Sequence, residues 1–200
     1  MPEKTLNIGK HECKIIYHID SGTPVVFLHG FSYSGDIWQK LTVTDFLKEN
    51  KISFLLLNMP YGAKSDCQPK TKDIEVNLNV ARESILSIFG SATPVLVGSS
   101  LGGFVGLNYA ARYPVKGLLL NSPVRTQNEN LLPKYHTFNF PVTIIRGTRD
   151  IVVSKEEMET LVSKLPNSEL KTYESAGHSA YAKYPNKFKQ DLLELYRKAS

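Results

Sequence analysis

The sequence has few of the features that mark several classes of protein. It contains only two cysteines, Cys13 and Cys67, which are too few for a disulfide framework, so we expect both thiols to be reduced. No window approaches the roughly 18 continuous apolar residues that a membrane-spanning helix needs, so we expect no membrane partner. Residues 1–10 contain no apolar run that could act as a secretory signal. We therefore predict a cytoplasmic protein.

Runs of basic residues are also absent, although the formal net charge is +5. The lysines are scattered along the chain, and no stretch of five or more basic residues occurs. We interpret the positive charge as an aid to solubility and predict no nucleic-acid partner. The sequence shows no heptad pattern or apolar stripe for assembly, so a monomer is our default expectation.

The chain does contain enough apolar material for one folded domain. Of its 200 residues, 42% are hydrophobic and 22% are charged, which excludes a disordered, coiled-coil or collagen-like chain. A chain of this length is typical of one domain of ordinary size. We therefore expect residues 1–200 to form a single domain.

Short apolar runs recur along the chain, and each ends in turn residues. They lack alternation, which is typical of strands buried on both faces of a parallel sheet, and they cover residues 25–28, 53–57, 94–97, 116–120 and 142–146. The segments between and after them favour helices, at residues 36–50, 73–89, 103–113, 155–164 and 183–198. This alternation predicts an α/β fold with a mostly parallel, doubly wound sheet. Residues 6–8 and 14–17 alternate in polarity and predict an antiparallel hairpin at the N-terminal edge.

The strongest chemical signal is the segment Gly98-Ser99-Ser100-Leu101-Gly102. It fits the pattern G-x-S-x-G and lies between a predicted strand and a predicted helix. Small residues let such a turn close tightly, and the turn holds its central serine above the carboxyl ends of the strands, where open α/β sheets bind ligands. We therefore predict that Ser100 is a nucleophile.

A serine is a poor nucleophile unless a base takes its proton. Of the five histidines, His178 is the best candidate because it lies in a small-residue loop after the predicted strand 169–173. An acid must orient the imidazole and stabilise its charged form, and Asp150 follows the predicted strand 142–146. Glu156 is less well placed because it lies inside the next helix. The simpler alternatives are a surface-loop histidine and a turn or helix-capping aspartate.

Backbone N–H groups are needed to hold the oxyanion that forms in acyl transfer. We predict that Leu101, the residue after the nucleophile, supplies one of them. Phe31, in the loop after the predicted strand 25–28, should supply the other. His29 precedes this loop, and we expect it to hold the loop by hydrogen bonds rather than to act in catalysis.

The order Ser100, Asp150, His178, together with His29-Gly30-Phe31 and the turn GSSLGG, resembles the α/β-hydrolase superfamily. This resemblance covers nearly the whole chain, and residues 28–65 are most similar to the small, lid-poor hydrolases of the CIB type. It implies an α/β-hydrolase fold with a minimal cap, formed here by residues 122–140, as one irregular loop or one short helix. Asn58 stands where many relatives carry Asp. This departure bears on which subfamily the chain resembles, but it leaves the predicted triad unaffected.

Residues that flank the predicted catalytic loops are the candidates for substrate binding: Tyr33, Val124, Phe138, Ile151 and Tyr181. A short cap leaves the site open, which favours small acyl substrates. The sequence thus predicts a serine hydrolase that cleaves carboxylic esters or thioesters through an acyl-enzyme, with no cofactor and no metal. The alternative is a non-catalytic binding protein of the same fold. A nucleotide-binding oxidoreductase is disfavoured because the first strand-to-helix turn lacks G-x-G-x-x-G.

Overall fold

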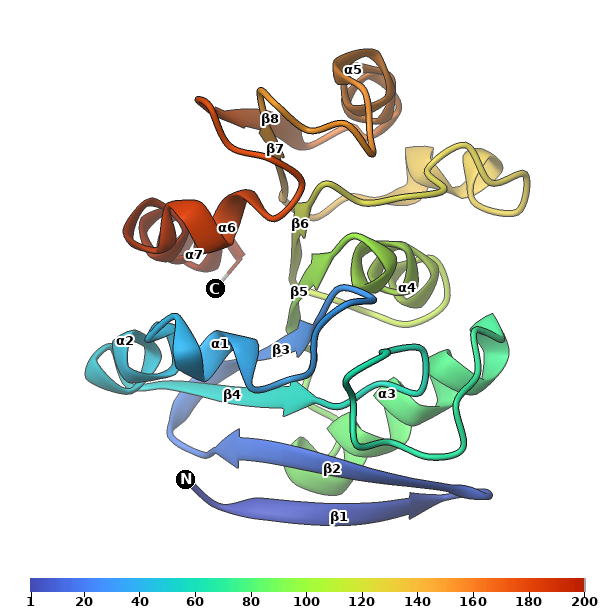
Figure 1. Cartoon of the computed structure of the whole chain (residues 1–200), viewed down its shortest axis with the longest axis vertical. Coiled ribbons are helices and arrows are strands. Elements are labelled where there is room, and N and C mark those ends of the chain that lie inside the picture. Colours follow the sequence, from blue (N-terminus) through green and yellow to red (C-terminus); the bar gives the residue numbers. More distant parts are fainter. Residues whose placement is uncertain (200) are drawn as a thin grey trace.

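The computed structural model describes residues 1–199 and is built on one eight-stranded sheet (Figure 1). The strand order is β1-β2-β4-β3-β5-β6-β7-β8. β1 and β2 form the expected antiparallel hairpin, β2 pairs antiparallel with β4, and every other neighbouring pair is parallel. The strands are β1 (Glu3–Ile8), β2 (His11–His18), β3 (Ser21–Leu28), β4 (Ile52–Leu57), β5 (Val95–Ser99), β6 (Gly117–Asn121), β7 (Val142–Gly147) and β8 (Ser168–Tyr173).

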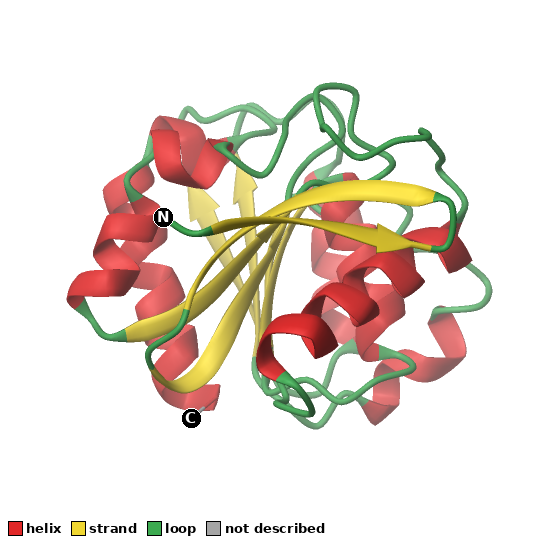
Figure 2. Cartoon of the chain, turned by 90° about the horizontal axis from the view of Figure 1, so that it is seen from below, coloured by secondary structure: helices red, strands yellow, loops and turns green. Residues whose placement is uncertain are grey.

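Helices cover both faces of the sheet (Figures 1 and 2). One face carries α1 (Ile37–Lys40), α2 (Val43–Glu49), α6 (Ala180–Lys183) and α7 (Pro185–Ala199). The other carries α3 (Ile74–Phe89), α4 (Leu101–Ala110) and α5 (Lys155–Lys164). The predicted doubly wound architecture is thus confirmed. None of the helices within residues 1–199 is long and apolar enough to cross a bilayer.

The central strands are apolar without alternation because both of their faces are buried. All described residues of β4, β5, β6 and β7 are buried, and the sheet separates two apolar clusters, one under each layer of helices. Residues 122–140 hold only the short 3-10 helix η1 (Leu132–Thr137) as a helical element, so the expected minimal cap is confirmed. The edge of the sheet where the parallel strands end is therefore covered by loops and not by a helical lid.

The helix predicted over residues 36–50 is wrong as a single element, because the chain forms two short helices there. Thr42 has a φ of 56°, in the left-handed region, and it separates α1 from α2. The run Thr42-Val43-Thr44 is β-branched, and such residues favour a helix less than unbranched ones do. Trp38 on α1 is fully buried against Phe27 and Phe188, so it anchors this region to the core.

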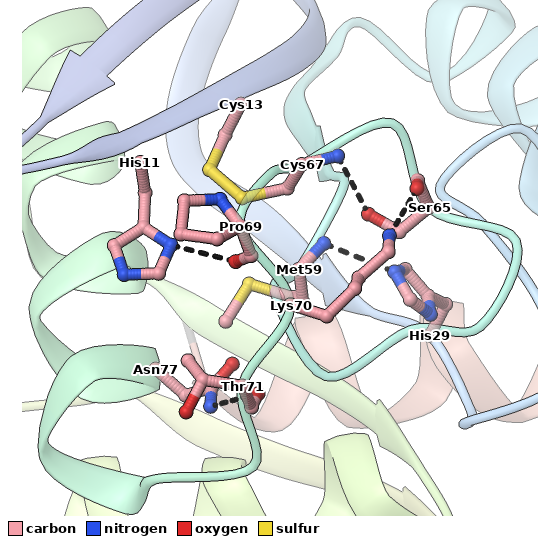
Figure 3. Close-up of a disulfide and its surroundings, with 10 residues drawn as sticks. All are labelled: His11, Cys13, His29, Met59, Ser65, Cys67, Pro69, Lys70, Thr71 and Asn77. Carbon is pink, nitrogen blue, oxygen red and sulfur yellow. Dashed lines mark hydrogen bonds between the residues drawn. A yellow bond between two sulfur atoms is a disulfide. The ribbon is translucent and has the colours of Figure 1, made fainter.

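The expectation of two reduced thiols is also wrong, because a disulfide joins Cys13 and Cys67 (Figure 3). Cys13 lies on β2, and Cys67 lies 54 residues further on, in the loop of residues 58–73 that follows β4. This loop turns back along β2, where Glu12 and Gln68 exchange two backbone hydrogen bonds of 2.8 and 3.0 Å. Both cysteines are fully buried. The number of cysteines cannot reveal this pairing, because the pairing depends on how the loop of residues 58–73 folds back onto β2.

We expect Cys67→Ala to lower the free energy of unfolding by about 3 kcal/mol, because a cross-link over this span restricts the unfolded chain. Urea denaturation of both proteins, without and with excess dithiothreitol, would measure the loss. In the reductant the wild type and the variant should unfold at nearly the same urea concentration. Coincident curves in the absence of reductant would contradict the prediction.

Candidate active site

The predicted catalytic residues lie at one edge of the sheet, where the parallel strands end in register. Leu28 of β3 pairs with Gly98 of β5, and Ser99 of β5 pairs with Asn121 of β6. Gly147 ends β7 one strand further along. The loops that follow these strands therefore emerge side by side, which is the arrangement in which open α/β sheets bind ligands.

Ser100 occupies a strained turn between β5 and α4. Its φ of 53° and ψ of −113° lie in a region that residues with a side chain rarely adopt. The turn closes because the neighbouring glycines leave no room for a side chain: a Cβ on Gly98 would lie 2.7 Å from the Gly102 carbonyl oxygen, and one on Gly102 would lie 2.2 Å from that of Leu28. The glycines of the motif are thus required by close backbone contact.

His178 and Asp150 form a hydrogen-bonded pair. The Nδ1 atom of the imidazole lies 3.1 and 3.0 Å from the two carboxylate oxygens of Asp150. The Asp150 side chain is fully buried, and its Oδ1 also accepts hydrogen bonds from the N–H groups of Val152 (2.8 Å) and Val153 (3.2 Å). Burial alone would raise the pKa of Asp150, but the hydrogen bonds from His178 and the Val152 N–H, together with the nearby Ser122 hydroxyl, outweigh it and lower the pKa to about 2.

This pairing defines the tautomer of the imidazole. An ionised carboxylate only accepts hydrogen bonds, so Nδ1 of His178 carries the proton and Nε2 of the neutral ring carries the lone pair. Nε2 is buried and has no hydrogen-bond partner among residues 1–199. A buried nitrogen that can accept a proton and has no partner is therefore available at this edge of the sheet.

Asn121 connects the Ser100 turn to the His178 loop, a role that the sequence analysis did not anticipate. Its carbonyl accepts a hydrogen bond from the Ser100 N–H at 2.9 Å, and its side-chain amide donates to the His178 carbonyl at 2.8 Å. One residue thus holds both loops next to each other. Its position at the end of the predicted strand 116–120, beside the turn, is the signal that could have identified it.

His29 has the structural role that we expected. Its Nδ1–H donates to the Gly30 carbonyl at 2.8 Å, and its Nε2 accepts from the Met59 N–H at 3.1 Å. Complete burial lowers its pKa to about 4, so the ring is neutral near pH 7. The Tyr61 hydroxyl donates to the His29 carbonyl at 2.6 Å. These contacts fasten the start of the β3–α1 loop to the loop of residues 58–73.

The two predicted oxyanion donors lie in different parts of the chain: Phe31 follows β3, and Leu101 directly follows Ser100. Leu101 begins α4, so its N–H has no partner within the helix. Phe31 lies in the β3–α1 loop, and its carbonyl accepts a hydrogen bond from the Ala63 N–H at 2.7 Å. No carbonyl of residues 1–199 accepts a hydrogen bond from the N–H of Phe31 or Leu101. Both groups are free to donate to a ligand.

The five predicted substrate-binding residues have very different environments. Tyr33 and Val124 are half-buried beside the site, where the Tyr33 hydroxyl donates to Ser179 Oγ at 3.2 Å. Phe138 and Tyr181 are fully buried core residues with no surface for a substrate to touch, so the structure contradicts a binding role for them. Ile151 is 97% exposed at the tip of the β7–α5 loop, where it lines an open cavity together with Asp150.

Comparison with known proteins identifies the family. The profile of the alpha/beta hydrolase fold family matches residues 23–139. The chain belongs to this family. Protein ABHD14A of Danio rerio is 27% identical to this α/β hydrolase over 179 residues, which are 87% of the present chain and 64% of that protein. The chain thus spans somewhat less than two thirds of the length of that relative.

Other relatives and solved structures are similar over most of this α/β hydrolase. ABHD14B of Homo sapiens, whose name marks it as a candidate protein-lysine deacylase, is 23% identical over 86% of this chain and 81% of that protein. A CIB-like hydrolase from Thermoplasma acidophilum superposes with a TM-score of 0.86, at 19% identity over 98% of this chain and 97% of that one. An esterase from Exiguobacterium antarcticum gives a TM-score of 0.77, at 18% identity over 93% and 96%. The two structures confirm the fold.

The lowered pKa of Asp150 predicts a specific loss of stability in acid. A carboxylate whose pKa is depressed by folding stabilises the protein above its unfolded pKa of about 4, and this contribution disappears as the pH falls towards about 2. We expect the difference in unfolding free energy between wild type and Asp150→Asn to shrink by about 2 kcal/mol between pH 5 and pH 2. Urea denaturation across this range measures it.

A matched control for this titration is Asp45→Asn, which changes an exposed carboxylate on α2. The loss for Asp150→Asn between pH 5 and pH 2 should clearly exceed any change seen with this surface control. A constant difference for Asp150→Asn would show that the Asp150 carboxylate is not held in its ionised form.

Proposed function

We propose that this α/β hydrolase is a serine hydrolase that cleaves carboxylic esters or thioesters of small acyl groups. The observation that carries the proposal is the His178–Asp150 pair. Its Nε2 is buried and has no partner among residues 1–199, and Asn121 connects its loop to the strained Ser100 turn. A buried polar atom without a partner costs free energy and needs a reason. Accepting the Ser100 proton during the reaction supplies that reason.

The proposed reaction starts with attack of Ser100 Oγ on the carbonyl carbon of the acyl group. His178 Nε2 takes the hydroxyl proton, and the ionised Asp150 stabilises the imidazolium that results. The N–H groups of Phe31 and Leu101 donate to the oxyanion of the tetrahedral intermediate. The imidazolium then protonates the leaving alcohol or thiol, and an ester on Ser100 remains. Water, deprotonated by the same nitrogen, attacks this ester and releases the acid.

The open edge of the sheet supports small acyl substrates, because no helical lid formed by residues 1–199 covers it to enclose a long chain. The similarity to a solved esterase and to ABHD14B is consistent with acyl transfer to water. A binding protein of the same fold would have no need of the strained serine or of a base held in one tautomer. We therefore favour the enzyme.

A fluorophosphonate probe tests the proposal, because such probes phosphonylate only activated serines. We expect stoichiometric labelling of the wild type, with the label at Ser100, and no labelling of Ser100→Ala. Ser99→Ala is the matched control, since it removes the adjacent buried hydroxyl and should still be labelled. A folded wild type that stays unlabelled would overturn the proposal and favour a binding protein.

A further inference from the structure

A separate cavity of about 360 Å³ lies beside the β3–α1 loop. Phe31, which is 43% exposed, supplies one wall, and the loop of residues 58–73 supplies the rest. The lining combines apolar side chains, among them Phe31 and Pro60, with the two lysines Lys70 and Lys72. The mechanism described above does not use this cavity, although one of its walls carries a proposed oxyanion donor.

The two lysines give the cavity a positive charge. No acidic residue lines it, and within residues 1–199 no carboxylate oxygen lies within 4.0 Å of either ammonium group. The Lys72 ammonium sits 4.6 Å from the centre of the Phe31 ring, and the Lys70 ammonium donates to the Ser65 carbonyl (Figure 3). Asp73 is occupied in capping α3 through the N–H groups of Glu75 and Val76.

In the described part of the chain, the positive charge of Lys70 is balanced only by the more distant carboxylate of Asp66. Asp66 raises the pKa of Lys70, but partial burial of the ammonium is the larger effect and lowers it. An anion in the cavity would offset this desolvation. Phe31 and Pro60 form an apolar wall next to the two cations, so the cavity suits a short apolar chain that ends in an anionic group.

The order of the strands places this cavity on a defined side of Ser100. Ser100 follows β5, and the loops that build the cavity follow β3 and β4 on one side of it. Asp150 follows β7 and His178 follows β8, on the other side. In the proposed reaction His178 protonates the leaving group, which must therefore lie on its side of the serine. The acyl chain then extends in the opposite direction, towards the cavity.

We propose that this cavity binds a carboxylate at the far end of the acyl chain, so that the preferred substrates are monoesters or monothioesters of short dicarboxylic acids. Lys72 and Lys70 pair with the carboxylate, while Phe31 and Pro60 contact the methylene groups. This inference rests on the proposed function and adds a substrate class to it. The lysines determine specificity and take no part in the chemical step.

The test compares charged and neutral esters of matched shape. The 4-nitrophenyl monoesters of glutaric and adipic acid are paired with the neutral 5-methylhexanoate and 6-methylheptanoate, in which an isopropyl group replaces the carboxylate. For each pair, the ratio of kcat/KM, charged over neutral, is measured after subtraction of spontaneous hydrolysis. The proteins are wild type, Lys72→Gln, the double variant Lys70→Gln/Lys72→Gln, and Lys64→Gln. Lys64 is an exposed lysine of the same loop that does not line the cavity.

We expect the wild type to prefer at least one charged ester about tenfold or more, and Lys72→Gln to reduce this preference about tenfold. The double variant should abolish it, Lys64→Gln should retain it, and kcat/KM for the neutral esters should change less than twofold throughout. An equal preference in wild type and in both cavity variants, or a wild type that prefers the neutral esters, would overturn the inference.

Ser100→Ala, assayed with all four esters, distinguishes a failure of the proposed function from a failure of the proposed substrate class. Turnover of the neutral esters that depends on Ser100 supports the proposed function whatever the charge ratio shows. If no ester shows turnover that depends on Ser100, the proposed function fails and the substrate class fails with it. Circular dichroism of each variant confirms that the lysine substitutions leave the fold intact.

Discussion

Ser100→Ala should lower kcat for 4-nitrophenyl butyrate at least 10³-fold, with KM changed only a few-fold. The substitution removes the only oxygen that can form the acyl-enzyme in the proposed reaction. The donors at Phe31 and Leu101 and the His178–Asp150 pair stay in place, so some rate enhancement over water remains. Steady-state kinetics on purified protein, with the variant assayed at high concentration, provides the measurement.

Ser100→Gly makes this prediction sharper, because glycine tolerates the backbone conformation that strains serine and alanine alike. We expect Ser100→Gly to be as inactive as Ser100→Ala but more stable to urea by about 1–2 kcal/mol. That combination would show that the backbone strain at residue 100 serves to place the serine hydroxyl for catalysis and not to stabilise the fold. Activity above a tenth of the wild-type rate in either variant would mean that another group performs the attack.

Most of the architecture could be predicted from the sequence because its physical causes are local. The strand at residues 142–147 carries the apolar residues Val142, Ile144 and Ile145, which pack into the clusters on both faces of the sheet, and its burial follows from that composition. The turn at Ser100 could be predicted because the motif itself requires small residues on both sides of the serine. The break in the helix predicted over residues 36–50 could not be predicted from its β-branched residues alone, because α1 and α2 also pack separately against the sheet.

Side-chain environments were harder to predict than positions along the chain. Phe138 and Ile151 both flank a predicted catalytic loop, yet one is fully buried and the other almost fully exposed. Sequence proximity to a loop does not tell which way a side chain points or what covers it. The disulfide of Cys67 and the two cavity lysines share this limitation, since each depends on the path of the loop of residues 58–73 across the sheet edge.

Gly102→Ala should destabilise the protein by about 4 kcal/mol or prevent folding. A Cβ at this position would lie 2.2 Å from the Leu28 carbonyl oxygen and 2.6 Å from that of His29. Added groups in a packed core usually cost about 1–3 kcal/mol, but here both contacts are with backbone, which cannot turn aside as a side chain can. Relief requires α4 to move away from β3, so Ser100 would separate from the Phe31 loop and activity would fall as well.

The matched control is Gly106→Ala, one turn further along the same helix. A Cβ there would meet only the side chains of Leu120 and Leu28, each at 3.8 Å, which is ordinary contact. Alanine also favours a helix over glycine by about 1 kcal/mol, so Gly106→Ala should be neutral or slightly stabilising and fully active. Urea denaturation and ester hydrolysis of both variants test this contrast. If the two substitutions had equal effects, close contact between α4 and the end of β3 would not be what requires glycine in the motif.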